Sequence, residues 1–573
     1  MSAAVELARS QASIGSDAAP RAAQRLRAGP IAWAAGALAL AALILSPVVS
    51  LALTAAGGSS EVWPHLLAHV LPQATITTAL LLGGVGLLVV MLGVGSAWLV
   101  AAYEFRGRGL LEIGLLLPLA VPTYIVAFAY LDLLHPIGPV QSTLRELLGV
   151  ARPKDLLLPE IRSLPGCILL LGFVLYPYVY LPTRALFLMQ AGTFIEAARI
   201  LGRSPTAVFF RIALPLARPA IALGTSLALM ETLNDIGAAE FLGVRTLTVQ
   251  VYATWINRSD LPGAAQIALV MLAMVLLLLA AERWGRRGRG YAGTGQRQRD
   301  MARHRLSGAP ASAALCLGIL PIAIGFLIPA AYLAHSASAR VTRLGFPRGV
   351  IAEAGNTLLY ASLATLLAAA CGFLVAAGPR LVARRFGQGL IRIAALGYAL
   401  PGAILAIGLL GPLALADASL SRITTALFGV APAIIGVGAG GALVIAYLVR
   451  FLAVGVGACE AGLAKVPGSL GEAGLMLGRG PVGTLMRVHL PMTWPALLSG
   501  ALLVFVDCVK ELPATLLLRP LNVETLATHL YGEAVRGTYE DGAVAALLIV
   551  VVGLIPVALL LRLGPAERGP RGG

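Results

Sequence analysis

The most reactive positions in this 573-residue chain are ionisable side chains set inside long apolar stretches. Two acidic pairs with i, i+4 spacing, and a lysine within the second pair, form this set: Glu231, Asp235, Asp507, Lys510 and Glu511. Such spacing predicts that the two acids of a pair share one face of a helix. An ionisable group in the hydrocarbon of a membrane is costly unless paired or hydrated, which makes these residues candidates for a translocation path. Carboxylate oxygens suit a hard cation such as Fe³⁺. The structural alternative is that Lys510 pairs with a neighbouring acid and the acids hold helix ends.

Other reactive residue types do not combine into a site. His65 and His69 have metal-ligand spacing, but two ligands are too few for a metal site. The five cysteines are scattered without any C-x-x-C motif, which predicts neither a zinc site nor a disulfide framework. A phosphate-binding loop reads G-x-x-x-x-G-K-[ST], and none of the three lysines follows a glycine. We therefore expect no catalytic residues, no metal, no cofactor and no ATP hydrolysis by such a loop in this chain.

The composition indicates the elements that must position these residues. Hydrophobic residues make up 58% of the chain and charged residues 12%, so a soluble shell cannot cover the apolar surface. This excludes an ordinary soluble enzyme and a disordered chain, and it predicts an all-α polytopic membrane protein. The net charge of +16 is interpreted as basic loops that fix membrane orientation, not as nucleic-acid binding.

Stretches of about 20 apolar residues can cross a bilayer, and twelve candidates are found. They are 31–55, 76–101, 110–134, 165–189, 215–237, 262–281, 311–334, 355–378, 389–415, 424–452, 492–516 and 543–563. Placing the N-terminus in the cytoplasm puts 30 Lys and Arg on the inner side and 12 on the outer side. Both termini are therefore expected in the cytoplasm. The expected organisation is an N-terminal tail (1–30), a first six-helix half (31–281), a basic linker (282–310), a second half (311–563) and a C-terminal tail (564–573).

A duplicated segment at an offset of 276 residues is the most informative feature. Residues 196–221 and 472–497 align without gaps and are identical at 11 of 26 positions. Six spans lie between the copies, so both copies are expected on the cytoplasmic side and the halves are parallel repeats.

Each copy predicts a short helix, a turn and a second helix, which together we call a knob. Gly202 and Gly478 suit a left-handed cap that ends the first helix. Pro205 and Pro481 suit the first turn of the next helix. In the second knob, apolar residues recur on one face of the first helix at Leu470, Ala473, Met476 and Leu477.

The pattern E-A-A-x-x-x-G followed by I-x-L-P resembles the cytoplasmic loop of permease subunits of binding-protein-dependent ABC importers. The first knob carries it in full, and the second has Gly474 for Ala and Val488 for Ile. The resemblance implies a coupling helix that docks on an ATPase. Carried onto this chain, the coupling residues are Glu196, Ala197, Ala198, Gly202, Glu472, Ala473, Gly474 and Gly478.

Residues 231–255 and 510–531 narrow the resemblance to the fused, double-length permeases of ferric-iron importers, with thiamine-type permeases as close relatives. This implies the type I ABC importer permease fold in a bacterial inner membrane, an iron cargo delivered by a solute-binding protein, and two separate ATPase subunits. Two alternatives stay open. A gradient-driven transporter with 6+6 helices would not explain two matched knobs, and a membrane-embedded enzyme would need clustered His or Asp within the spans.

Overall fold

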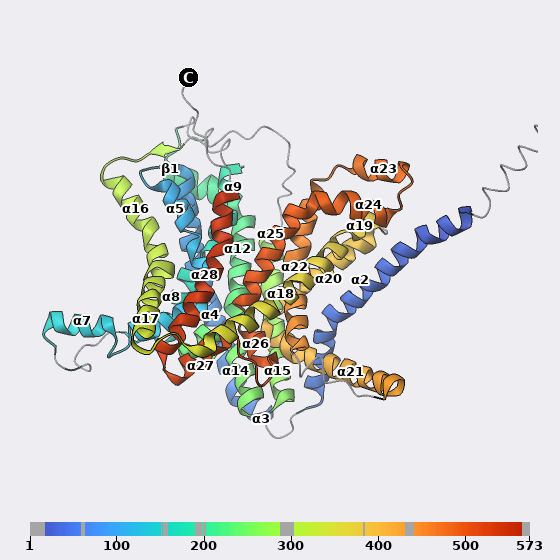
Figure 1. Cartoon of the computed structure of the whole chain (residues 1–573). Coiled ribbons are helices and arrows are strands. Elements are labelled where there is room, and N and C mark those ends of the chain that lie inside the picture. The colour runs from blue at the N-terminus through green and yellow to red at the C-terminus, as the bar shows by residue number, and fades with distance from the viewer. Residues whose placement is uncertain are drawn as a thin grey trace, which may run out of the picture. The chain divides into compact units, whose positions relative to one another are not determined.

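The protein is described by a computed structural model (Figure 1). The structure describes residues 18–58, 63–150, 152, 159–189, 198, 202–286, 303–381, 384–429 and 440–563. Nearly all of these residues lie in helices, because long apolar stretches in a bilayer must satisfy their backbone groups internally. The prediction of an all-α polytopic membrane protein is confirmed.

The first part of the chain consists of helices that end at Arg286. The α-helices here are α2 (Ala18–Ala56), α3 (Trp63–His65), α4 (Leu71–Ala102), α5 (Arg108–Gly114), α6 (Thr123–Leu133), α7 (Pro139–Leu148), α8 (Leu164–Leu175), α9 (Pro177–Met189), α11 (Pro205–Val208), α12 (Leu214–Asn234), α13 (Gly237–Phe241), α14 (Leu247–Tyr252) and α15 (Leu261–Arg286). Short π- or 3₁₀-helical turns join some of them: η1 (Leu66–Val70), η2 (Leu117–Ala120), η4 (Phe209–Ala213) and η5 (Ala253–Asn257).

The second part resumes after the linker. Its α-helices are α16 (Ala309–Ile322), α17 (Ile328–Leu344), α18 (Arg348–Ala376), α19 (Gly378–Leu381), α20 (Arg384–Ala399), α21 (Gly402–Phe428), α22 (Gly441–Ala464), α23 (Gly468–Met476), α24 (Pro481–Thr484), α25 (Leu490–Val509), α26 (Pro513–Leu518), α27 (Leu526–Arg536) and α28 (Tyr539–Leu563). Two π-helical turns, η6 (Ala323–Leu327) and η7 (Leu485–His489), lie within longer helical runs.

Among the described residues, ten helices are long and apolar enough to cross a membrane. Two further pairs are bent, α5–η2 with α6 by 91° and α8 with α9 by 41°, and counting each pair as one span gives up to twelve. The first bend lies at Pro122 and the second at Pro177, where a missing N–H and the proline ring interrupt the helix. The predicted count of about twelve spans is consistent with this structure.

The sequence placed two spans of the second half differently from the structure. The predicted span 389–415 is divided at Pro401 into α20 and α21, and α21 then continues to Phe428. The next span is α22, which begins at Gly441 and not at residue 424. The reason is that an apolar window contains no information on where a proline ends the helix.

The chain forms two compact units that do not follow the two sequence halves. One unit contains residues 1–49, 360–400 and 411–508, and the other contains residues 50–359, 401–410 and 509–573. In the first unit, the indole N–H of Trp33 in α2 donates to the carbonyl oxygen of Leu374 in α18 at 2.7 Å. The first helix of the chain thus packs on helices of the second half.

The larger unit shows the reciprocal arrangement. Its α16 packs closely on α5, since a Cβ at Gly318 would lie 2.3 Å from the side chain of Leu111. The hydroxyl of Tyr130 in α6 donates to the carbonyl oxygen of Ile324 at 2.7 Å. Helices α16 and α17 therefore pack on the first half. The division into two six-helix halves remains a prediction.

The end of the predicted linker is attached to this same unit. Strands β1 (Tyr103–Glu104) and β2 (His304–Arg305) pair in parallel, and Arg303 forms an ion pair of 3.4 Å with Glu104. Residues 287–302 of the linker lie outside the described residues.

Candidate functional site

The second knob has the predicted helix–turn–helix geometry. Helix α23 ends at Met476, and the cap that follows contains Gly478, whose φ of +76° is the left-handed conformation that glycine adopts without strain. The Arg479 N–H donates to the Gly474 carbonyl at 3.1 Å, and the Leu477 N–H donates to the Ala473 carbonyl at 3.0 Å. The first of these bonds closes the wide turn of a Schellman cap. Helix α24 then begins at Pro481, as predicted.

The described part of the first knob repeats this cap. Gly202 has φ +74°, and the Arg203 N–H donates to the Ala198 carbonyl at 3.1 Å, matching the second copy in position and length. Helix α11 begins at Pro205, and the Ser204 side chain accepts from the Ala207 N–H. The predicted glycine caps and proline starts are confirmed in both copies. Glu196 and Ala197 lie outside the described residues.

The first helix of the second knob presents apolar side chains outward. Met476 is 89% exposed and Leu477 80% exposed, and Glu472 and Ala473 beside them are also exposed. A protein surface on which apolar side chains protrude next to a carboxylate is typical of a protein interaction site. Gly474, in contrast, faces inward. A Cβ there would lie 2.8 Å from the Thr484 side chain, which explains why this copy has glycine where the first has Ala198.

Each knob is continuous with a membrane-spanning helix. From Pro205 the chain runs through η4 into α12 as one 30-residue helix that ends at Asn234. From Pro481 it runs through η7 into α25 as one 29-residue helix that ends at Val509. The second helix of each knob and the residues at the far end of the span therefore belong to one continuous helix.

The candidate path residues lie at these far ends. Glu231 and Asp507 are in the last turns of α12 and α25, whereas Asp235 and Glu511 follow the helix ends. The sequence expectation that each pair shares one helical face is therefore wrong, because the helix stops between its members. Glu231, Asp507 and Lys510 are half-buried, and each makes polar contacts.

Asp235 and Glu511 cap the short helices that follow. The Asp235 carboxylate, 7% exposed, accepts the Ala238 N–H at 2.8 Å and so caps α13. The Glu511 carboxylate, 5% exposed, accepts the N–H groups of Ala514 and Thr515, both at 3.0 Å, at the start of α26. It also accepts the Thr515 hydroxyl at 2.9 Å. A carboxylate at a helix N-terminus satisfies otherwise unpaired N–H groups and interacts favourably with the helix dipole.

Hydrogen bonds connect the ends of α12 and α25 to residues that closely follow Pro401 and Pro122. The side-chain oxygen of Asn234 accepts the N–H of Gly402 at 2.7 Å, at the residue after Pro401. The hydroxyl of Tyr124, two residues after Pro122, donates to the carbonyl oxygen of Lys510 at 3.4 Å. Pro122 and Pro401 thus lie next to groups that hold the ends of the knob-bearing helices.

Sequence reasoning did not single out a buried cation of the second half. Arg450, at the end of the predicted span 424–452, lies in α22 with nine residues of that helix before it, and it is 6% exposed. Its guanidinium donates to the carbonyl oxygen of Leu400, after the end of α20, at 3.3 Å. A span from 441 to 464 places this arginine near the middle of the helix and not at its end, and an arginine inside the membrane is a functional candidate by default.

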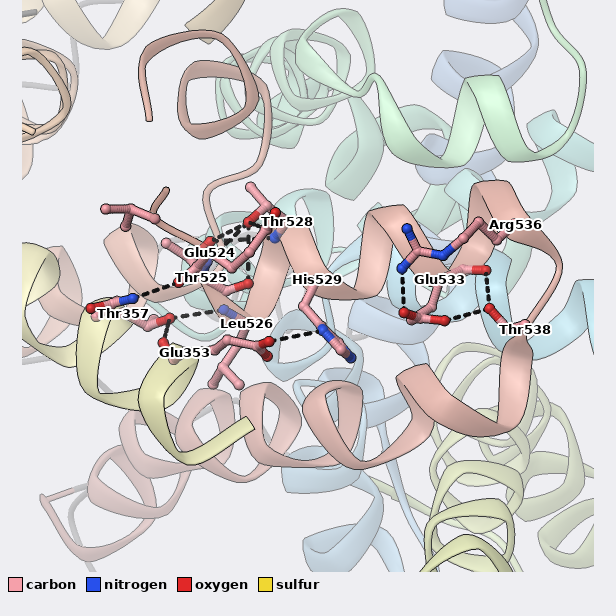
Figure 2. A network of polar contacts seen from close by, with 12 residues as sticks. Glu353, Thr357, Glu524, Thr525, Leu526, Thr528, His529, Glu533, Arg536 and Thr538 are labelled. Atoms are coloured by element: carbon pink, nitrogen blue, oxygen red, sulfur yellow. Dashed lines mark hydrogen bonds and ion pairs between the residues drawn. The ribbon is translucent and has the colours of Figure 1, made fainter. Parts of the chain in front are cut away.

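A pair of hydrogen bonds repeated in the two halves was also missed. The Thr78 hydroxyl oxygen in α4 accepts the N–H of Leu247, the first residue of α14, at 3.0 Å. The Thr357 hydroxyl oxygen in α18 accepts the N–H of Leu526, the first residue of α27, at 2.9 Å. We call each pair a threonine clamp, and Figure 2 shows the second with the polar residues around it. Both clamps join residues 169 positions apart, which no local motif signals.

The two histidines in the predicted first outer loop do not belong to any of the sites described above. The rings of His65 and His69 are stacked with centroids 5.1 Å apart, and both are exposed. Within the described ranges, no group of three or more His, Cys, Asp or Glu is arranged to hold a metal ion.

Comparisons with known proteins identify the class. Residues 89–287, which include the first knob, match the family described as "Binding-protein-dependent transport system inner membrane component". The chain is 24% identical to the Fe(3+)-transport system permease protein FbpB 2 of Haemophilus influenzae over 492 residues, which cover 84% of this chain and 88% of that protein.

Two shorter relatives match part of the chain. The putative 2-aminoethylphosphonate transport system permease protein PhnU of Salmonella typhimurium is 33% identical over 175 residues, 29% of this chain and 60% of that protein. The molybdenum transport system permease protein ModB of Escherichia coli is 29% identical over 201 residues, 34% of this chain and 83% of that protein.

The helical fold and these matches define the chain as a multi-pass membrane permease. More particularly, residues 89–287 carry the inner membrane component of binding-protein-dependent transport systems, and the chain over most of its length is similar to a double-length transport permease.

Proposed function

We propose that this permease imports ferric iron, which a solute-binding protein delivers to its outer face. Two copies of a separate ATPase subunit dock on the two knobs and drive transport. Both termini and both knobs then face the cytoplasm, in agreement with the excess of Lys and Arg in the loops expected there.

The knob geometry is the observation that carries this proposal. The same glycine cap and proline start occur twice, each at the beginning of one continuous membrane-spanning helix. In the second knob, Met476 and Leu477 protrude next to the exposed Glu472. This surface suits a partner that buries the apolar side chains and pairs a basic group with the glutamate.

The path of the cargo follows from where the knob-bearing helices end. Closure of the ATPase dimer displaces the knobs, and each continuous helix carries that displacement to Glu231 and Asp235 or to Asp507, Lys510 and Glu511. We propose that these residues border the translocation path. Because Asp235 and Glu511 also cap α13 and α26, movement of the helix ends reorients these two short helices. The half-buried Glu231 and Asp507 are the better candidates for direct contact with a hard cation.

The coupling role is tested by the double substitution Glu196→Ala with Glu472→Ala. In proteoliposomes containing the permease, its ATPase and its binding protein, we expect assembly to be intact and uptake to be lost. The exposed Glu160→Ala is a matched control with unchanged uptake. Normal ATP-driven uptake by the double variant would refute the docking role.

The cargo is tested separately by uptake of radiolabelled ferric iron, molybdate and thiamine with the cognate binding protein. We expect iron to be transported. Uptake of molybdate or thiamine alone would retain the permease and reject the iron assignment. Uptake driven by an ion gradient without the ATPase would favour a secondary transporter.

A further inference from the structure

Helix α7 is amphipathic and contributes little to the protein interior. Val140, Leu144, Leu147 and Leu148 recur at i, i+4, i+7 and i+8, which forms one apolar stripe. None of the residues of α7 is fully buried. Leu147 is 78% exposed and Leu148 58% exposed, and Ile137 just before the helix is 74% exposed. Most of the apolar stripe is therefore left uncovered by the described residues of the chain.

Hydrogen bonds fix α7 at the level where a membrane span ends. The Gln141 side-chain amide donates to the carbonyl oxygen of Leu134 at 2.8 Å, and Leu134 directly follows the last residue of α6. Arg145 donates to the carbonyl oxygen of Pro136 in the same connection. Polar side chains of α7 thus turn back toward the end of α6, and the helix lies beside a membrane boundary.

The orientation of α7 suits a bilayer surface. In Figure 1 it extends sideways from the end of the helical bundle, roughly across the direction of α8, α16 and α17 of the same unit. Its two charged residues, Arg145 and Glu146, have opposite signs, so it offers no net charge to an acidic or basic protein. In the same unit, the candidate span that runs from α16 through α17 also presents apolar side chains outward, with Leu317 67% exposed.

We propose that α7 is an interfacial anchor, whose apolar stripe lies among the lipid acyl chains just below the headgroups. Amphipathic helices with an apolar face of large side chains and a polar opposite face lie in bilayer interfaces in this way. This inference rests on the membrane-spanning class of the chain and not on its cargo or its ATPase.

Spin labelling of the full-length permease in nanodiscs tests the proposal. In a variant with all five cysteines replaced that still assembles, a nitroxide is placed at Leu147→Cys on the stripe, and at Glu146→Cys, exposed on the opposite side of the helix, as the matched control. Accessibility to oxygen, which concentrates in lipid, is compared with accessibility to a water-soluble nickel chelate. We expect the label at 147 to be several-fold more accessible to oxygen, and the label at 146 to be more accessible to the chelate.

Two results would overturn the inference. If the label at 147 is more accessible to the nickel chelate, the stripe is in water. If it is accessible to oxygen until the binding protein is added and then shielded from both reagents, the stripe is a protein docking site. Both results leave the transport function unaffected, since the assay does not measure uptake.

Discussion

The two threonine clamps each provide an acceptor for the first N–H of a short helix, but the charges around the two clamps differ. Each threonine hydroxyl donates to the carbonyl four residues earlier, Ala74 or Glu353, and accepts the first N–H of the next short helix. Around the first clamp, the positions that correspond at an offset of 279 residues are neutral: Ala74, Gln250 and Thr254. Around the second they are Glu353, His529 and Glu533. Glu353 and His529 form an ion pair of 3.0 Å (Figure 2).

This difference shows which features of a duplicated permease are interchangeable. An unpaired N–H in a buried position costs the full desolvation of that group, so the hydroxyl is retained in both halves. Charged pairs between partly exposed side chains contribute little to stability, and the two halves differ there. Asp235 and Glu511 also differ between the halves. Both cap equivalent helices, but Asp235 accepts one N–H group and Glu511 accepts two.

The largest difference in stability between substitutions in the two halves is expected at Glu511 and Asp235, the carboxylates that cap α26 and α13. Glu511→Ala removes an acceptor of two N–H groups and one hydroxyl, and Asp235→Ala removes the acceptor of one N–H. We expect losses of about 3 kcal/mol and about 2 kcal/mol in stability, respectively. Thermal unfolding in detergent measures both. Glu511→Gln and Asp235→Asn, which keep an acceptor oxygen, serve as controls. Equal melting temperatures for the two alanine variants would show that the additional bonds of Glu511 do not contribute.

The clamps themselves should respond equally. Thr78→Val and Thr357→Val each leave one buried N–H without its acceptor, at a cost of about 1–3 kcal/mol. Thr→Ser at either position keeps the hydroxyl and should restore most of the stability. Hydrogen exchange of the Leu247 and Leu526 amides measures the local effect. Faster exchange in one half alone would contradict the equivalence of the clamps.

The glycine caps of the knobs provide a second test of equivalence. Gly202→Ala and Gly478→Ala force a Cβ into the left-handed conformation, at a cost of about 1 kcal/mol each. Gly→Asn is the tolerant control, since asparagine adopts this conformation more readily. Because the cap sets the direction of the knob, ATP-driven uptake should fall about as much in either alanine variant. A loss confined to one knob would indicate that the two ATPase contacts are unequal.

The smallest effect is a pH dependence confined to the second half. The hydrogen bond to Glu353 is the main cause that raises the pKa of His529 above its usual 6.5, with the Glu353 and Glu533 charges adding to it and burial opposing it. A raised folded-state pKa stabilises the protein fully below the unfolded value, and this stabilisation is lost as pH rises through the folded pKa. Wild type should therefore lose roughly 0.5–1 kcal/mol, the upper part of the range for ion pairs near a surface, between pH 6 and 9.

The variant His529→Gln, which introduces the residue found at the equivalent Gln250, should abolish that dependence. Melting curves at several pH values measure the difference between variant and wild type. A parallel pH profile in the two proteins would show that His529 does not contribute.

Local sequence signals predicted the local structure of this permease well. Gly202, Gly478, Pro205 and Pro481 predicted the knob turns, because each residue type meets a specific backbone requirement. Apolar length predicted the spans, but Pro401 divided one of them and moved the next.

Features that depend on the tertiary structure could not be predicted. The acidic pairs were expected on helical faces, and the structure places a helix end between the members of each pair. The threonine clamps and the position of Arg450 depend on which helices pack together, and spacing along the chain does not specify this.

The most direct test of the account is uptake by proteoliposomes that contain the permease and the binding protein, with and without the ATPase subunit and ATP. The account predicts cargo accumulation when both ATPase and ATP are present, and none when either is omitted. Accumulation without the ATPase would contradict it, because transport would then not depend on an ATPase that docks on the knobs.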